Sequence, residues 1–151
     1  MRGRHFGVSS VFTVILTAVI VFMSSGMQIK ACDVGTLISY INAVRSESGV
    51  NTLFVDESLT EAAAVRAREC AVVYSHTRPD GTLWYTVNNA SFGENLAKAS
   101  NEEQAGNLNI TAGWYLNPSH RQNLLEKRFT KIGVAYYEEG GITYVACEFG
   151  L

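Results

Sequence analysis

The sequence predicts an α+β fold in which helices pack on a small, mainly antiparallel sheet. Two observations carry this prediction. Apolar residues recur at helical spacing in the first half of the chain beyond residue 31, and two strand-like apolar runs, 132–137 and 142–149, follow near its end. The Glu-Glu-Gly-Gly turn at 138–141 joins these runs, so we expect a terminal β-hairpin.

The first helix is predicted over 33–48, because Leu37, Ile38, Ile41 and Val44 form one helical stripe, and Gly49 ends it. A short apolar connector follows at 53–55. The second helix is predicted from a Ser58–Glu61 capping box to about residue 74. Its small apolar face is suited to close packing, and its members are Leu59, Ala63, Ala67, Cys70 and Tyr74.

The next segment, 77–92, is predicted to be a loop, with a Pro-Gly turn at 78–81 and a short strand at 83–87. A second capping box, Ser100 with Glu103, is expected to open a helix that runs to about residue 115. Asn117 is predicted to be the N-cap of a short helix from Pro118 to about residue 125.

Residues 1–31 are predicted to form a signal peptide and to lie outside the fold. Arg2 and Arg4 precede an uncharged apolar run over 8–23, which is shorter than the roughly 20 residues of a membrane-spanning helix. An uncleaved N-terminal anchor is the alternative. Both interpretations place residues 32–151, a single domain, outside the cytoplasm, so we expect a secreted or cell-surface protein.

The cysteines leave two questions open. Cys32 directly follows the predicted signal, and a lipoprotein-type signal that ends there would attach a lipid to its thiol. With three cysteines in the chain, Cys70 and Cys147 then remain as a candidate disulfide, which an exported domain permits. Two buried free thiols are the alternative.

The composition excludes two classes of protein. Beyond residue 31 the chain holds 9 basic and 14 acidic residues, a formal charge of −5, whereas nucleic-acid binding needs clustered Lys and Arg. A hydrophobic fraction of 47% with two prolines excludes a disordered chain. We expect a monomer that contacts a membrane only through a lipid on Cys32 or an uncleaved signal.

His76, Glu94 and His120 are the candidate functional residues. Both histidines lie at the edges of predicted elements, where sites are usually built, and Glu94 is flanked by Gly93 and Asn95. Two imidazoles and a carboxylate can bind a divalent metal or act as a general acid and base. Their spacing matches no local ligand motif, so hydrogen-bonded structural histidines are the alternative. Trp84 and Trp114 are expected in the core.

Three sequence blocks and two terminal segments stand out by their order along the chain. The blocks are Ser-His-Thr-Arg-Pro-Asp-Gly at 75–81, Phe-Gly-Glu-Asn-Leu-Ala at 92–97, and Trp-Tyr-Leu-Asn-Pro-Ser-His-Arg-Gln-Asn-Leu-Leu at 114–125; the terminal segments are Ile-Gly-Val at 132–134 and Glu-Phe-Gly at 148–150. This ordered set resembles the CAP family in its secreted bacterial form, which is the SCP domain of cysteine-rich secretory proteins, antigen 5 and pathogenesis-related proteins. The resemblance runs from about Leu37 to Gly150.

The resemblance implies an α-β-α sandwich, with helices on both faces of the sheet, and a central cleft lined by two histidines and two acids. His76, Glu94 and His120 match the first histidine, the first acid and the second histidine. Asn117 stands at the position of the second acid, where it can hydrogen-bond but cannot supply charge or act as a base. Members of the family are described as binding metals, sterols, lipids or peptides, so the resemblance assigns no single activity.

Three functions follow as hypotheses. The first is a binding module whose cleft holds a divalent metal (Zn, Mg or Ca) or a small-molecule, lipid or peptide ligand, with walls from Tyr74, Trp84 and Tyr115. The second is a hydrolase acting on peptide or cell-envelope material, with a water or a hydroxyl of Ser75, Ser91 or Ser119; no Gly-x-Ser-x-Gly motif is present. The third is a structural or adhesive domain. We favour the first, and thus a protein that is not an enzyme.

Overall fold

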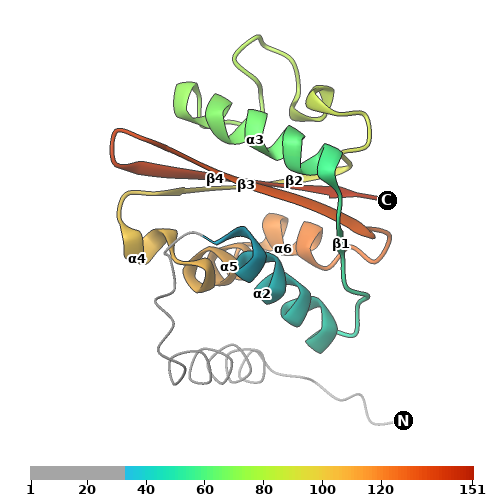
Figure 1. The fold of residues 1–151 in the computed structure, drawn as a ribbon. Coiled ribbons are helices and arrows are strands. Elements are labelled where there is room, and N and C mark those ends of the chain that lie inside the picture. The colour runs from blue at the N-terminus through green and yellow to red at the C-terminus, as the bar shows by residue number, and fades with distance from the viewer. Residues whose placement is uncertain (1–32) are drawn as a thin grey trace, which may run out of the picture. The chain divides into compact units, whose positions relative to one another are not determined.

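The computed structural model describes residues 33–151, which belong to one compact unit spanning residues 31–151. The predicted signal peptide and Cys32 lie outside the described residues. Helix α3 covers one face of a four-stranded sheet, and α2, α5 and α6 cover the other (Figure 1). The predicted α-β-α sandwich is confirmed. Within 33–151, no helix is both long enough and apolar enough to cross a membrane.

The sheet has the strand order β1-β3-β4-β2, which places β1 and β2 at its edges. β1 pairs with β3 in parallel, and the two other pairs are antiparallel. Gly140 and Gly141 form the predicted hairpin turn with φ of 58° and 76°, a conformation that glycine adopts without steric cost. The strands are β1 (Phe54–Val55), β2 (Gly93–Ala99), β3 (Lys131–Glu139) and β4 (Ile142–Gly150).

Three predicted helices are present, those expected over 33–48, from Ser58 to about residue 74, and from Pro118 to about residue 125, with small differences in their bounds. The second helix begins two residues before the predicted position, because its N-cap is Asp56, whose side chain accepts from Leu59 N–H, while Ser58 donates only to Asp56. Asn117 is the N-cap of the short helix, as predicted. The helices are α2 (Val34–Glu47), α3 (Glu57–Val72), α4 (Glu102–Ala105), α5 (Asn107–Leu116), α6 (Pro118–Leu124) and the 3-10 helix η1 (Trp84–Val87).

Three predictions of secondary structure are wrong. The single helix expected over 100–115 is two helices, because Gly106 has an extended ψ of 135° and interrupts the helix. Its first part is capped by Asn101 rather than Ser100. Residues 84–87 form η1 rather than a strand. Strand β2 was not expected from the pattern of its residues.

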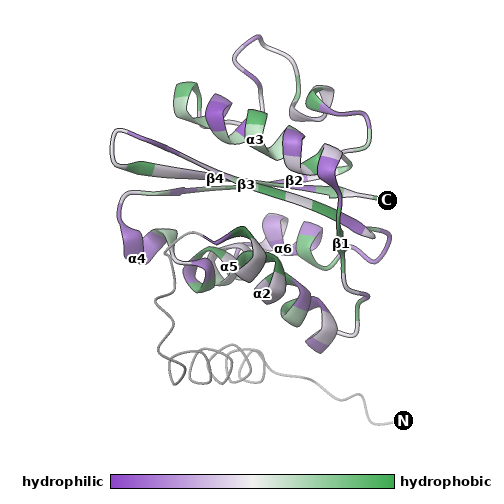
Figure 2. Cartoon of the chain, viewed as in Figure 1, coloured by the Kyte–Doolittle hydropathy of each residue, from purple (hydrophilic) through white to green (hydrophobic). Residues whose placement is uncertain are grey.

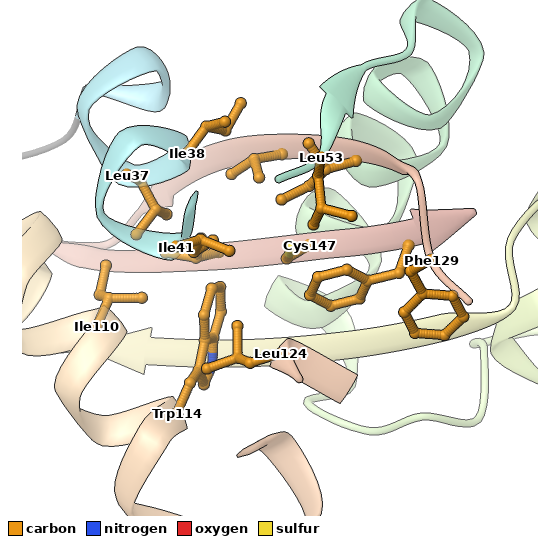
Figure 3. Close-up of a cluster of buried hydrophobic side chains, with 13 residues drawn as sticks. Leu37, Ile38, Ile41, Leu53, Ile110, Trp114, Leu124, Phe129 and Cys147 are labelled. Carbon is orange, nitrogen blue, oxygen red and sulfur yellow. The ribbon is translucent and has the colours of Figure 1, made fainter. Parts of the chain in front are cut away.

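The larger hydrophobic cluster fills the space between the sheet and the α2, α5 and α6 layer (Figure 3). Trp114 lies at its centre, 2% exposed, and its indole Nε1 donates to the Leu96 carbonyl over 2.9 Å. Full burial of a large apolar side chain contributes about 1.5–3 kcal/mol each. In Figure 2 the strands carry hydrophobic stretches, whereas α4 is largely hydrophilic. Trp114 is thus a core residue as predicted, whereas Trp84 is only partly buried.

The cluster beneath α3 is built from small residues, which lets the helix approach the sheet closely. Gly133 lies at the closest point: a Cβ there would stand 2.1 Å from the Leu59 carbonyl carbon. Cys70 packs in this cluster, whereas Cys147 packs in the cluster on the other face, and both are free thiols. The predicted disulfide is therefore wrong, because the sheet separates the two cysteines, and the alternative of buried free thiols holds.

Arg45 is a buried cation that holds an irregular segment in place. It is fully buried in α2, and its guanidinium donates to the carbonyls of Asn51, Leu124, Glu126 and Phe129 at 2.7–3.2 Å. Because these carbonyls face inward and lack helix or strand partners, the guanidinium satisfies groups that would otherwise be costly to bury. Arg45 thereby holds the segment between α6 and β3 against the C-terminal part of α2.

Candidate functional site

His76 and Glu94 are in direct contact. The imidazole Nδ1 lies 2.7 Å from Glu94 Oε1, with the His76 side chain 52% exposed and the Glu94 side chain buried. His76 follows the end of α3, and Glu94 is the second residue of β2, so the contact joins the loop after the helix to the sheet edge. Since a carboxylate accepts, Nδ1 carries the hydrogen, and Nε2 is left to meet solvent or a ligand.

Arg66 fixes the Glu94 carboxylate from the other side. Its Nε donates to Oε2 at 2.6 Å and its Nη2 to Oε1 at 3.3 Å, and neither side chain is exposed. Burial by itself raises the pKa of Glu94. Hydrogen bonds from His76 and Arg66, together with the Arg66 charge, lower it by more, so the pKa lies below its ordinary value. Glu94 is therefore an ionised, immobile group that orients His76.

The loop that carries His76 is anchored by a second ion-pair layer. Arg66 also donates to the Ser75 carbonyl and to Glu69, both at 2.6 Å. Glu69 in turn binds Arg78 of the loop at 2.7 Å. Hydrogen bonds from both arginines and their charge outweigh the effect of burial and hold the pKa of Glu69 below its ordinary value. These contacts give His76 a defined position beside the sheet although it lies in a loop.

His120 reaches the same region from the opposite layer. It lies in the first turn of α6, where the Asn117 side chain accepts from the N–H groups of Ser119 and His120. Asn95 of β2 donates to the His120 carbonyl at 3.0 Å and so ties α6 to the strand. Burial, and then the proximity of His76, lowers the pKa of His120, so we expect a neutral imidazole at neutral pH.

His120 lines a groove of about 280 Å³. Tyr74, two residues beyond the end of α3, lines this groove together with residues of α5 such as Ile110. Of the three wall residues expected, only Tyr74 is there. Trp84 lines a separate pocket beside η1, and the Tyr115 ring is covered by the Arg121 guanidinium at 5.7 Å.

The donor set does not fit a metal centre. Within residues 33–151, no group of three or more His, Cys, Asp and Glu side chains is arranged to hold a metal ion. Glu94, the expected anionic ligand, is buried and already bound by the Arg66 guanidinium, whose positive charge repels a cation. Asn117 uses its side-chain oxygen as a helix cap. The expected His76–Glu94–His120 metal site is therefore not supported.

Each hydroxyl considered as a nucleophile has another partner. Ser75 Oγ accepts from Thr77 N–H, and Ser119 Oγ donates to Asn117. Ser91 Oγ donates to Glu148, a buried residue of β4. Burial raises the pKa of the Cys70 thiol to about 11, and the pKa of the Cys147 thiol is also raised, so both stay protonated.

Sequence reasoning missed Arg66, Glu69 and Glu148, which surround Glu94. Arg66 lies within the alanine-rich helix, four residues after Ala62, and is a cation on a face otherwise made of small apolar residues. That placement is an available signal for a buried ion pair, since arginine is almost never fully buried without a partner. Glu148 gives a similar signal, because it lies in an apolar strand on the same face as Ala146.

The sequence and the fold identify a CAP domain. The chain belongs to the CAP, or cysteine-rich secretory protein, family, whose model matches residues 38–149. A curated relative, the uncharacterized protein YkwD of Bacillus subtilis, is 27% identical over 114 residues, which is 70% of this chain and 43% of YkwD. The chain thus spans less than half the length of that relative.

Solved structures show the same fold. An extracellular SCP-domain protein of Bacillus anthracis aligns with a TM-score of 0.61 and 21% identity, over 78% of this chain and 40% of its own. An outer surface protein of Borrelia burgdorferi aligns with a TM-score of 0.61 and 22% identity, over 77% of this chain and 90% of its own. At these identities the likeness establishes the fold alone.

Proposed function

We propose that this chain is an extracytoplasmic binding module that captures a peptide or small polar molecule between His76 and His120. The observation that carries the proposal is the 2.7 Å contact of His76 with Glu94, whose carboxylate Arg66 holds in turn. A half-exposed imidazole held by a buried ion pair presents Nε2 in a defined direction, which suits ligand recognition. The two aligned proteins described as extracellular and outer-surface support a location outside the cytoplasm.

A peptide or small polar ligand is favoured over a metal ion, because Glu94, the anionic ligand that a metal would need, is neutralised by Arg66. A neutral His120 can donate and accept hydrogen bonds, and it adds no charge to the groove. The pair therefore suits a ligand with carbonyl, amide or hydroxyl groups.

Hydrolysis is the second candidate, and the Glu94–His76 pair favours it. A buried carboxylate that orients a histidine through Nδ1 is the arrangement by which enzymes prepare a general base. No described serine hydroxyl is hydrogen-bonded to His76, so this reaction would use His76 to activate a water molecule.

The test uses residues 31–151, which form the compact unit. Thermal unfolding is recorded with short peptides, soluble cell-wall fragments, fatty acids or Zn²⁺, beside the variant His76→Ala/His120→Ala and the control Arg68→Ala. A ligand at 100 times its Kd adds about 2.7 kcal/mol, or several degrees. We expect a peptide or cell-wall fragment to shift wild type and Arg68→Ala but not the double variant.

The same mixtures are examined by mass spectrometry for cleavage products. Cleavage that Glu94→Gln abolishes would establish the hydrolase and overturn a purely binding role. A shift by Zn²⁺ that requires both histidines would contradict the conclusion that the site does not fit a metal. Equal shifts in unfolding temperature for wild type and the double variant with every compound would contradict a binding site at His76 and His120.

A further inference from the structure

Strand β2 is an edge strand whose outer backbone groups are incompletely paired. The Glu94 carbonyl accepts from Asn123 at 3.1 Å, and the Leu96 carbonyl accepts from the Trp114 indole. These bonds show that the even-numbered residues of β2 point their backbone groups away from β4, since alternate residues of an antiparallel strand face opposite neighbours. Farther along, Ser100 N–H donates to Gln104.

Three outward groups remain between these partners. Within residues 33–151, no hydrogen bond is made by Leu96 N–H, Lys98 N–H or Lys98 C=O on the outer side of β2. Leu96 and Lys98 are two residues apart, which is the spacing at which one strand bonds to its neighbour. An unpaired row of this kind is a template for a further strand.

The groove that His120 lines also includes this edge. Leu96, Ala97, Lys98 and Ala99 of β2 all line it, with Tyr74 and α5 as its walls. Gly113 of α5 is part of the wall, and a Cβ there would meet nothing within 4 Å, so the groove is open at that position. An extended chain therefore has access to the edge from Lys98 toward His120.

We propose that an extended peptide segment adds to β2 as a fifth strand of the sheet and contacts His120 in the same groove. This inference rests on the proposed function and specifies its ligand as a peptide in strand conformation. N–H and C=O groups at strand spacing match a peptide backbone, whereas a lipid chain offers them no partners. Main-chain bonds would supply the affinity, and the groove walls would select side chains.

The sharpest test replaces the backbone group itself. Lys98→Pro removes the outward N–H but no bond of the β2–β4 ladder, because proline is tolerated on an edge strand where its nitrogen faces solvent. Lys98→Ala is the matched control, since it removes the same side chain and keeps the N–H. The probe is a heptapeptide selected from a bead-displayed library on residues 31–151, and its Kd is measured by fluorescence anisotropy.

We expect Lys98→Ala to bind the selected heptapeptide within about threefold of wild type and Lys98→Pro to bind it about tenfold more weakly than Lys98→Ala. Circular dichroism should show the same unfolding temperature for the two variants within a few degrees. A second readout is N-methylation of each amide of the heptapeptide in turn. Strand addition predicts that methylation at alternate positions abolishes binding and that the intervening positions tolerate it.

Failure of this inference is distinguishable from failure of the proposed function. A heptapeptide that requires His76 and His120 but binds Lys98→Pro and Lys98→Ala equally would leave the binding module standing and overturn strand addition. A library that yields no binder would overturn the peptide ligand. A concentration-dependent dimer in sedimentation velocity that Lys98→Pro abolishes would show that a second copy of this chain occupies the edge, which also contradicts the proposal.

Discussion

Glu148 lies directly opposite Glu94 in the register of β2 and β4, and neither residue is exposed to solvent beyond 3%. Two carboxyl groups this close cannot both be ionised cheaply. Burial, and then the Glu94 charge, raises the pKa of Glu148 well above its ordinary 4.5. An ionised Glu148 would leave Oε1 without a donor, whereas a proton on Glu148 allows it to donate to Glu94. Glu148 is the neutral member of the pair.

Replacing Glu148 by glutamine should change the pH dependence of stability. Above pH 4.5 the unfolded chain loses a proton that folded Glu148 keeps, so wild-type unfolding free energy falls as pH rises toward the raised pKa. Glu148→Gln should flatten that fall, as measured by urea unfolding from pH 5 to 8. The lowered pKa of Glu94 acts in a separate window below 4.5, where stability is lost as pH falls. Glu138→Gln, on the exposed hairpin, is the control; parallel curves for all three proteins would contradict the assignment.

Removing the Arg66 guanidinium should be strongly destabilising. Arg66→Met leaves the Glu94 carboxylate buried without its cation, and breaking a buried pair in this way costs about 3–5 kcal/mol. The measurement is urea unfolding at pH 7. Arg68→Met, an exposed arginine of the same helix, should stay within about 0.5 kcal/mol of wild type. In a double-mutant cycle, Glu94→Gln should recover part of the loss, and simple additivity of the two changes would speak against the pair.

Much of the layered fold was predictable because its signals are local. Asn117 before Pro118, and two glycines between apolar runs, each fix a short piece of backbone through their own chemistry. Strand β2 was not predictable in this way, because its consecutive polar residues Glu94 and Asn95 turn to opposite layers of the fold. Each is satisfied by a distant residue, Arg66 or Asn123, so neither looks like part of a buried strand in the sequence.

The candidate site was predictable only in part. The resemblance named His76, Glu94 and His120, but the spacing of these residues gave no reason to join them. What joins His76 to Glu94 is the pairing of β2 with β4 and the Arg66 guanidinium, and both are tertiary features. The expected metal site lacks support for the same reason, because the Glu94 carboxylate, which the sequence offers as a free ligand, is already paired with Arg66 in the fold.

Gly133→Ala should displace α3 from the sheet. The added methyl group would stand 2.1 Å from the Leu59 backbone, which cannot move as a flexible side chain can. Overpacking of this kind costs about 1–3 kcal/mol or more. The thermal unfolding temperature should fall by several degrees. Gly113→Ala is the opposite control, because it meets nothing within 4 Å in α5 and should stabilise the helix; equal effects of the two substitutions would contradict the close approach.

Asn117→Ala should loosen the first turn of α6. The lost cap is expected to cost about 1 kcal/mol in urea unfolding, and Asn117→Asp should retain stability because its carboxylate accepts the same N–H groups. NMR hydrogen exchange at Ser119 and His120 is the second measurement, with faster exchange expected in Asn117→Ala alone. Unchanged exchange would show that Asn95 and Asn123, rather than the cap, position the histidine.

The guanidinium of Arg45 has a consequence for the order in which the chain acquires its structure. The carbonyls that it binds at Leu124, Glu126 and Phe129 are 79 to 84 residues away along the chain. The segment between α6 and β3 contains no helix or strand that could fix its backbone locally. Its carbonyls therefore gain these hydrogen bonds only when α2, which carries Arg45, has packed beside it. Contacts at such separation form slowly, because a long loop has to close before they are made. We therefore expect the segment between α6 and β3 to become ordered late in folding, after α2 has packed against it.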